Sequence, residues 1–156
     1  MKKLLALLVF ALCVTPVFAD NSGLALEAFS DGTAGIGYYQ PMWAAGVSGR
    51  YTRLDESTKT RNLAITPWLE LRTSVAPNTN MFAGVSVGMG FLGLAADEAI
   101  TKDLTPALFT GFDYEISSKI LVQSFVSYSV RSYTTPTDVA HSEATLGATL
   151  GLSYFL

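Results

Sequence analysis

The sequence predicts an all-β protein, an eight-stranded antiparallel up-and-down transmembrane β-barrel with a filled interior. The first observation behind this prediction is the composition: the 156 residues are 49% hydrophobic and only 15% charged, whereas soluble domains carry about 25% charged residues. The second is that beyond residue 20 no apolar run approaches the roughly 20 residues that a membrane-spanning helix needs. The third is that apolar residues alternate with small or polar ones, which is the period of a β-strand.

Residues 1–19 have the layout of a secretory signal peptide. A short basic start is followed by an apolar stretch that is too short to span a membrane, and small residues precede a cut after Ala19. We therefore expect export across the inner membrane and a single barrel domain over residues 20–156. The one Cys of the chain, Cys13, would leave with the signal peptide, so no disulfide is predicted.

Each predicted strand has one apolar face and one small or polar face. In residues 146–156 apolar side chains alternate with Gly, Thr and Ser, and residues 81–93 behave in the same way. The alternation is interrupted by turn residues such as Gly, Pro, Asn, Asp and Ser. We predict strands at roughly 22–29, 33–40, 42–54, 61–75, 80–94, 103–114, 119–133 and 142–156.

The connections between the predicted strands also alternate in length. Those after the second, fourth and sixth strands are short turns, and those after the third, fifth and seventh are longer loops. Short turns at one end and longer loops at the other are typical of an outer-membrane barrel, and closure lets strands satisfy every backbone hydrogen bond in lipid. The first hairpin, residues 22–40, fits least because its strands are short and its loop is tight.

The two faces of the strands carry different residues. With the apolar face toward lipid, aromatic residues fall near both ends of the strands, as interfacial girdles require. The predicted aromatic girdle comprises Tyr38, Trp43, Tyr51, Phe91, Phe112, Tyr114, Tyr128 and Tyr154. The opposite face would fill the lumen with small side chains and with paired charges, since unpaired buried charge is costly. The predicted interior charge network comprises Glu27, Arg50, Glu70, Arg72, Asp113 and Arg131.

With its signal peptide, alternating strands and asymmetric connections, the chain resembles the small eight-stranded bacterial outer-membrane barrels of the OmpA/OmpX type. The resemblance covers residues 20–156, and no motif points to a particular member. The C-terminal insertion signal of that family usually ends in Tyr-x-Phe; here Tyr154 keeps the Tyr and Leu156 replaces the final aromatic residue. The resemblance implies a monomer in the outer membrane that contacts lipid and lipopolysaccharide and is recognised by the insertion machinery through its last strand.

No residue pattern predicts a cofactor or a metal site. Residues 88–93 match the spacing of a dinucleotide-binding motif, but they lie inside a predicted strand and no helix follows. A chain with one His and one Cys lacks the ligands of a zinc site. The net charge of −3, more negative once Lys2 and Lys3 leave with the signal peptide, argues against nucleic acid as a partner, because binding it requires clustered Lys and Arg.

Barrels of this form serve different roles, so the fold alone does not supply a function. The sequence favours a non-enzymatic outer-membrane protein with a structural or interaction role at the cell envelope. Four cations near the expected outer rim would meet lipopolysaccharide phosphates, namely Arg53, Lys59, Arg61 and Lys102. Two alternatives stay open. One is an enzyme that hydrolyses or transfers an acyl chain of lipid A, with His141 and Ser142 as catalytic candidates. The other is a narrow, porin-like channel lined by the inward charges.

Overall fold

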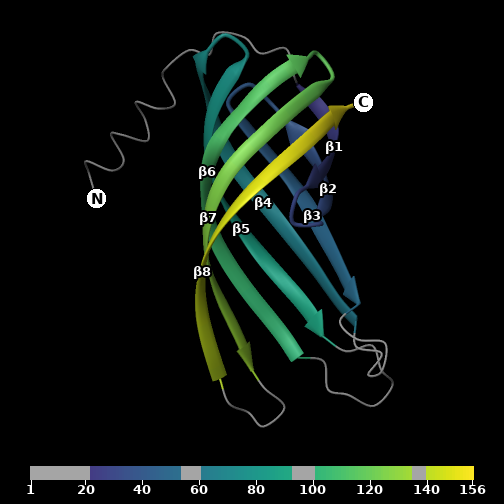
Figure 1. Ribbon diagram of the computed structural model, residues 1–156, viewed down its shortest axis with the longest axis vertical. Coiled ribbons are helices and arrows are strands. Elements are labelled where there is room, and N and C mark those ends of the chain that lie inside the picture. The colour runs from purple at the N-terminus through teal and green to yellow at the C-terminus, as the bar shows by residue number, and fades with distance from the viewer. Residues whose placement is uncertain (1–21, 54–60, 93–100, 135–139) are drawn as a thin grey trace, which may run out of the picture.

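A computed structural model shows an all-β protein whose antiparallel strands, β1 to β8, close into a barrel, which confirms the predicted all-β architecture and the closure of the eight strands (Figure 1). The structure describes residues 22–53, 61–92, 101–134 and 140–156, with only the backbone at 52, 53, 61, 62, 91, 92, 101–103, 133, 134, 140 and 141. In chain order the strands are β1 (Gly23–Phe29), β2 (Ala34–Tyr39), β3 (Trp43–Arg53), β4 (Arg61–Ala76), β5 (Thr79–Leu92), β6 (Thr101–Ser117), β7 (Ile120–Thr134) and β8 (Ala140–Phe155). Each strand pairs with the next, and β8 returns to pair with β1. Within the described ranges no helix is long and apolar enough to cross a membrane.

The two ends of the barrel differ in their connections (Figure 1). At one end, called here the turn end, tight turns join β2 to β3, β4 to β5 and β6 to β7, and the C-terminus lies there too. In the turn after β4, Asn78 has a φ of 59°, a left-handed conformation that Asn tolerates better than most residues. At the other end, the loop end, the strands flank residues 54–60, 93–100 and 135–139. The connections therefore alternate in length as the sequence predicts.

The β1–β2 hairpin is shorter than the other hairpins. Its last pair with β8 is Phe29 with Gly151, and its last pair with β3 is Ala34 with Gly49. Beyond these pairs Ser30 still bonds to Leu150 of β8, and the described residues nearer the loop ends of β8 and β3 pair only with β7 and β4. Figure 1 shows the hairpin ending well short of the level that the other strands reach. The barrel wall is therefore low on this side.

Two prolines lie inside strands without shifting the register. Pro67 of β4 pairs with Val47 of β3, and Pro106 of β6 pairs with Val87 of β5. The register is the same on either side of each proline, and the shifts in the β4–β5 and β6–β7 ladders lie next to the turns. The missing N–H groups are thus accommodated by local gaps in the ladder rather than by bulges.

Exposure alternates along the strands. Large apolar side chains on the outer face are about half exposed, as at Ile36 (51%), Leu69 (49%) and Val85 (48%). Most inward side chains are buried or half-buried, and the exceptions, such as Arg50, lie near the ends of the strands. The buried apolar cluster lies toward the turn end and comprises Ala25, Tyr39, Ala44, Leu121 and Phe155. The barrel therefore has an apolar exterior and a filled interior.

Candidate functional site

A hydrogen-bonded network centred on Tyr39 of β2 fills the lumen toward the turn end. The Tyr39 hydroxyl donates to Oε1 of Glu27 on β1, and it accepts from Nε2 of Gln123 on β7 at 3.1 Å. Oγ of Ser153 on β8 lies 3.3 Å from the same hydroxyl oxygen. All of these side chains are at most 4% exposed. A single phenol therefore connects the first two strands to the last two.

A second buried cluster, from β4, β5 and β6, places one cation among acids. Nη2 of Arg72 donates to Oδ2 of Asp113, and Nε of Arg72 lies 3.5 Å from Oε1 of Glu70, an ion pair without the alignment of a hydrogen bond. Nδ2 of Asn80 donates to the other oxygen of Asp113 at 2.8 Å. The guanidinium carbon of Arg72 also lies 4.8 Å from the ring centroid of Tyr39, within the range of a cation–π contact. The two clusters therefore form one plug.

Aromatic rings fill the lumen where neighbouring strands carry glycine. A Cβ at Gly46 would lie 2.5 Å from Cζ2 of Trp68, and a Cβ at Gly37 would lie 3.0 Å from the same atom. A Cβ at Gly151 would lie 2.7 Å from Cδ1 of Phe29. Because these distances leave no room for a side chain, the glycines create the space that the rings occupy. The lumen is thus packed by large rings set against small residues, in addition to the small side chains and paired charges that the sequence predicts.

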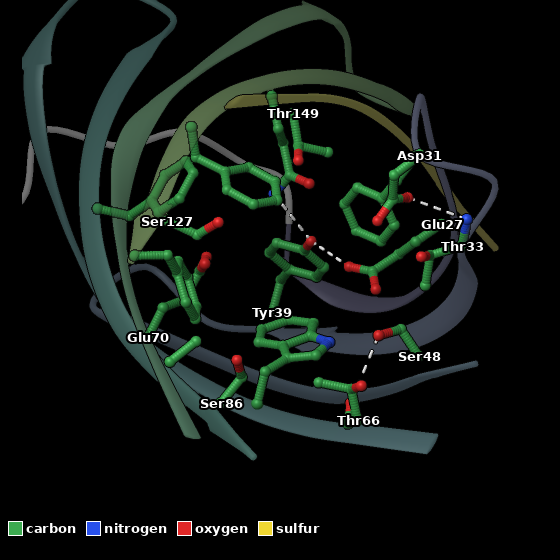
Figure 2. A pocket seen from close by; sticks show the side chains of 17 residues that line it. Glu27, Asp31, Thr33, Tyr39, Ser48, Thr66, Glu70, Ser86, Ser127 and Thr149 are labelled. Atoms are coloured by element: carbon green, nitrogen blue, oxygen red, sulfur yellow. Dashed lines mark hydrogen bonds between the residues drawn. The ribbon is translucent and has the colours of Figure 1, made fainter. Parts of the chain in front are cut away.

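Between the plug and the loop end lies a cavity of about 190 Å³ (Figure 2). Its lining includes residues from all of the strands and from the β1–β2 turn. Four of its rings pack against one another with centroids 5.8 to 6.2 Å apart, namely Phe29, Phe82, Phe109 and Phe125. Hydroxyl groups also line it, and they belong to Thr33, Tyr39, Ser48, Thr66, Ser86, Ser127 and Thr149. Apolar ring faces combined with a few polar groups are the usual composition of a small-molecule site.

The predicted interior charges divide between the plug and the loop end. Four of them are buried in the lumen, namely Glu27, Glu70, Arg72 and Asp113. Arg131 of β7 is half-buried. Arg50 requires a correction: it shares the inward parity of Ser48, but its side chain is exposed. Arg50 is exposed because the β1–β2 hairpin is short. The pairing of β2 with β3 ends at Gly49, one residue before Arg50.

Aromatic side chains lie on the outer face toward both ends of the strands. The exposed members of the predicted girdle are Tyr38, Trp43, Phe112, Tyr114 and Tyr154 toward the turn end, with Tyr51 and Tyr128 toward the loop end. The side chain of Phe91 lies outside the described residues. Tyr38 packs against Trp43 with ring centroids 6.0 Å apart, and Nε2 of Gln40 donates to the Tyr38 hydroxyl at 2.8 Å. Amphipathic rings at two levels of an apolar surface are what a bilayer interface favours.

Several predicted site residues lie outside the described part of the chain. These are the predicted signal peptide at 1–19, Lys59 as a whole, and the side chains of Arg53, Arg61, Lys102 and His141. Ser142 is exposed on β8, opposite Ser132 of β7. No group of three or more His, Cys, Asp or Glu residues that could hold a metal ion occurs in the part of the chain that the structure describes.

Two interior residues outside the predicted set are central to the lumen. Tyr39 alternates with the outward Tyr38, and Trp68 shares the parity of the inward Glu70 and Arg72. Strand parity therefore places both residues inside the barrel. Parity does not reveal which inward residues meet across the lumen, because that depends on the register around the closed sheet.

No family model, no curated protein and no solved structure matches this chain. Function has therefore to be inferred from the fold and from the chemistry of the interior.

Proposed function

We propose that this protein is a non-enzymatic outer-membrane β-barrel of the OmpA/OmpX type, with a structural or interaction role at the cell envelope. The observation that supports this proposal is the apolar exterior of the barrel. Large apolar side chains are exposed along the full length of the strands, for example Leu26 (47%), Val47 (51%) and Leu150 (60%). A soluble monomer rarely exposes an apolar patch larger than a few hundred Å². Lipid and lipopolysaccharide are the expected partners of such a surface, and the last strand is the expected signal for insertion.

A matched pair of substitutions on the outer face tests membrane insertion. Val47 and Val75 are both 51% exposed. Val47 lies midway between Trp43 and Tyr51 on β3, whereas Val75 lies beside the turn after β4. In a bilayer, Val47→Arg should destabilise the barrel by about 2–4 kcal/mol and Val75→Arg by about 0–1 kcal/mol, since the cost of a lipid-facing Arg depends on its depth.

The measurement is the free energy of unfolding in urea of the barrel refolded into phospholipid vesicles. Equal effects of the two substitutions would contradict a membrane-spanning barrel. Gel migration of the outer-membrane fraction gives a second readout, in which the folded barrel should migrate differently before and after boiling. A protein that stays soluble in the periplasm and migrates identically in both states would overturn the proposal.

The closed lumen favours a scaffold over a channel. Tyr39, Arg72 and Asp113 are at most 7% exposed, and their bonds join strands that are not neighbours, since Tyr39 of β2 accepts from Gln123 of β7 and Arg72 of β4 donates to Asp113 of β6. A conducting pore needs a continuous path of water, and this plug lies across such a path. We expect no steady conductance in planar bilayers. Stable single-channel steps would instead support the channel alternative.

Loss of the Ser142 hydroxyl tests the enzyme alternative. The two candidates, His141 and Ser142, are adjacent in the sequence, a spacing that in an extended segment does not favour a nucleophile and its base. A nucleophile and its base need to be within hydrogen-bond reach. Ser142→Ala should therefore leave the mass spectrum of lipid A unchanged, and a shift in its acyl chains would favour an enzyme.

A further inference from the structure

The cavity inside the barrel reaches the surface at the β1–β2 turn. Asp31 and Thr33 of this turn line the cavity, and Asp31 is exposed. The Asp31 carboxylate accepts from the backbone N–H of Thr33 at 3.0 Å, which holds the turn in place (Figure 2). Because the hairpin ends here, the described strands leave the cavity open beside this turn.

The charged side chains that line this cavity all have the same sign. Its lining contains three carboxylates, those of Glu27, Asp31 and Glu70, and the described lining residues include no Lys and no Arg. Arg72 lies beside Glu70, at 3.5 Å. Glu27 has a hydroxyl partner instead of a cation, since its Oε1 accepts from Tyr39. The charged side chains of the lining are therefore acidic, and among the described residues Arg72 forms its ion pairs with Glu70 and Asp113 and not with Glu27.

Glu27 is also incompletely satisfied. Its side chain is 4% exposed, and its Oε2 has no hydrogen-bond partner in the described part of the structure. Figure 2 shows the Glu27 carboxylate reaching toward Tyr39 near the middle of the lumen. A buried carboxylate is costly unless donors or a positive charge compensate it. One donor for two oxygens leaves an acceptor that a ligand can use.

The other side chains that line the cavity suit an organic molecule that carries a positive charge. Six of the lining residues are aromatic, namely Phe29, Tyr39, Trp68, Phe82, Phe109 and Phe125. Aromatic ring faces attract cations, and cages of such rings recognise organic ammonium groups. Arg72 stands 4.8 Å from the centroid of the Tyr39 ring, so this lumen already holds one cation in that way.

We propose that the cavity binds a small organic cation, an amine carrying one aromatic ring or a body of similar size, that enters from the loop end. The size follows from the volume of about 190 Å³, because an engineered cavity of about 150 Å³ holds benzene. The ammonium group lies at the Glu27 carboxylate and the apolar body lies against the phenylalanines. This site goes beyond a structural role and depends only on the barrel being folded.

The experiment uses fluorescence of the refolded barrel in detergent micelles. The chain has two Trp residues. Trp43 lies on the outer face and Trp68 lines the cavity, so a Trp43→Phe background leaves Trp68 as the reporter. Three probes of similar shape are titrated: benzylammonium, benzyl alcohol and benzoate. We expect saturable binding of benzylammonium, at least about tenfold weaker binding of benzyl alcohol, and no binding of benzoate.

Three further variants in this background localise the binding. Glu27→Gln keeps the shape and the acceptor for Tyr39 but removes the charge, and it should weaken benzylammonium binding by about tenfold to a hundredfold. Ala107→Phe should abolish binding by filling the cavity from β6. Glu115→Gln makes the same chemical change near the turn end, away from the cavity lining, and should leave binding unchanged.

Heat-modifiable migration verifies that each variant is folded, which separates failure of the site from failure of the barrel. Equal affinity for benzylammonium and benzyl alcohol would overturn the assignment of a cation. Benzylammonium binding that Glu27→Gln and Ala107→Phe both leave unchanged would overturn the site itself.

Discussion

Strands β3 to β8 run through both halves of this barrel, but the two halves are filled differently. Toward the turn end, Tyr39, Arg72 and Asp113 are buried and bonded to side chains of other strands. Toward the loop end, the lumen opens into a cavity lined partly by hydroxyl groups, and Arg50 is exposed although it points inward. The alternating pattern decides which side chains point inward, whereas strand length decides whether they are covered. Among the described strands, β1 and β2 line only the turn half, so all eight strands enclose that half and only β3 to β8 continue beyond it.

The largest expected effect is the loss of the buried cation. Arg72→Met would leave the carboxylates of Asp113 and Glu70 buried without their positive partner. Removing one partner of a buried ion pair costs about 3–5 kcal/mol, because the remaining charge is uncompensated. The free energy of unfolding in urea, followed by tryptophan fluorescence, should fall by that amount.

Two comparisons sharpen this prediction. Arg50→Met changes the same residue type in the open half and should alter stability by less than about 0.5 kcal/mol, as exposed substitutions usually do. The double variant Arg72→Met with Asp113→Leu should recover part of the loss, because it removes an uncompensated charge together with the cation. Similar losses for Arg72→Met and Arg50→Met would show that the two halves are not distinct.

A smaller effect is expected from a single methyl group on β3. At Gly46 a Cβ would lie 2.5 Å from the backbone oxygen of Ile36 and 2.5 Å from Cζ2 of Trp68. At Gly49 the nearest atom to a Cβ would be the backbone oxygen of Ala64, at 3.5 Å, an ordinary contact. Gly46→Ala should therefore cost about 1–3 kcal/mol through overpacking.

The control for Gly46→Ala is Gly49→Ala, a substitution three positions further along the same strand. It should be close to neutral in the same unfolding measurement, because its methyl group finds space. If Gly49→Ala were as costly as Gly46→Ala, the loss would reflect the backbone of β3 and not the ring of Trp68.

The alternating sequence predicted the closed barrel well, because parity and turn residues are local properties of the chain. Strand parity also sets Glu27, Glu70, Arg72 and Asp113 on the inner face, where the structure buries them. The exposure of Arg50 was not predicted from its parity, since it depends on where two other strands stop.

The partners inside the lumen were harder to predict than the strands. Tyr39 and Ser153 are 114 positions apart in the chain, and they meet only because β8 closes on β1. Their contact depends on the register around the whole sheet. For the same reason, no local pattern in the sequence indicated that rings from several strands would enclose a cavity.

The smallest expected effect compares two serines, one from each half. Ser153 is fully buried, and its Oγ lies 3.3 Å from the Tyr39 hydroxyl and 3.5 Å from Oε1 of Gln123. Ser127 lines the cavity and is half-buried. Ser153→Ala should cost about 0.5–1.5 kcal/mol, the net value of an internal hydrogen bond, whereas Ser127→Ala should stay within about 0.5 kcal/mol.

Urea unfolding resolves this difference if the two variants are measured side by side in the same vesicles. Which of the two variants loses more unfolding free energy matters more than the size of the difference. Water can hydrate the groups around Ser127 but not those around Ser153. If Ser127→Ala were the more damaging change, the hydroxyl groups of the cavity would belong to a structural network, and the loop half would be packed as firmly as the turn half.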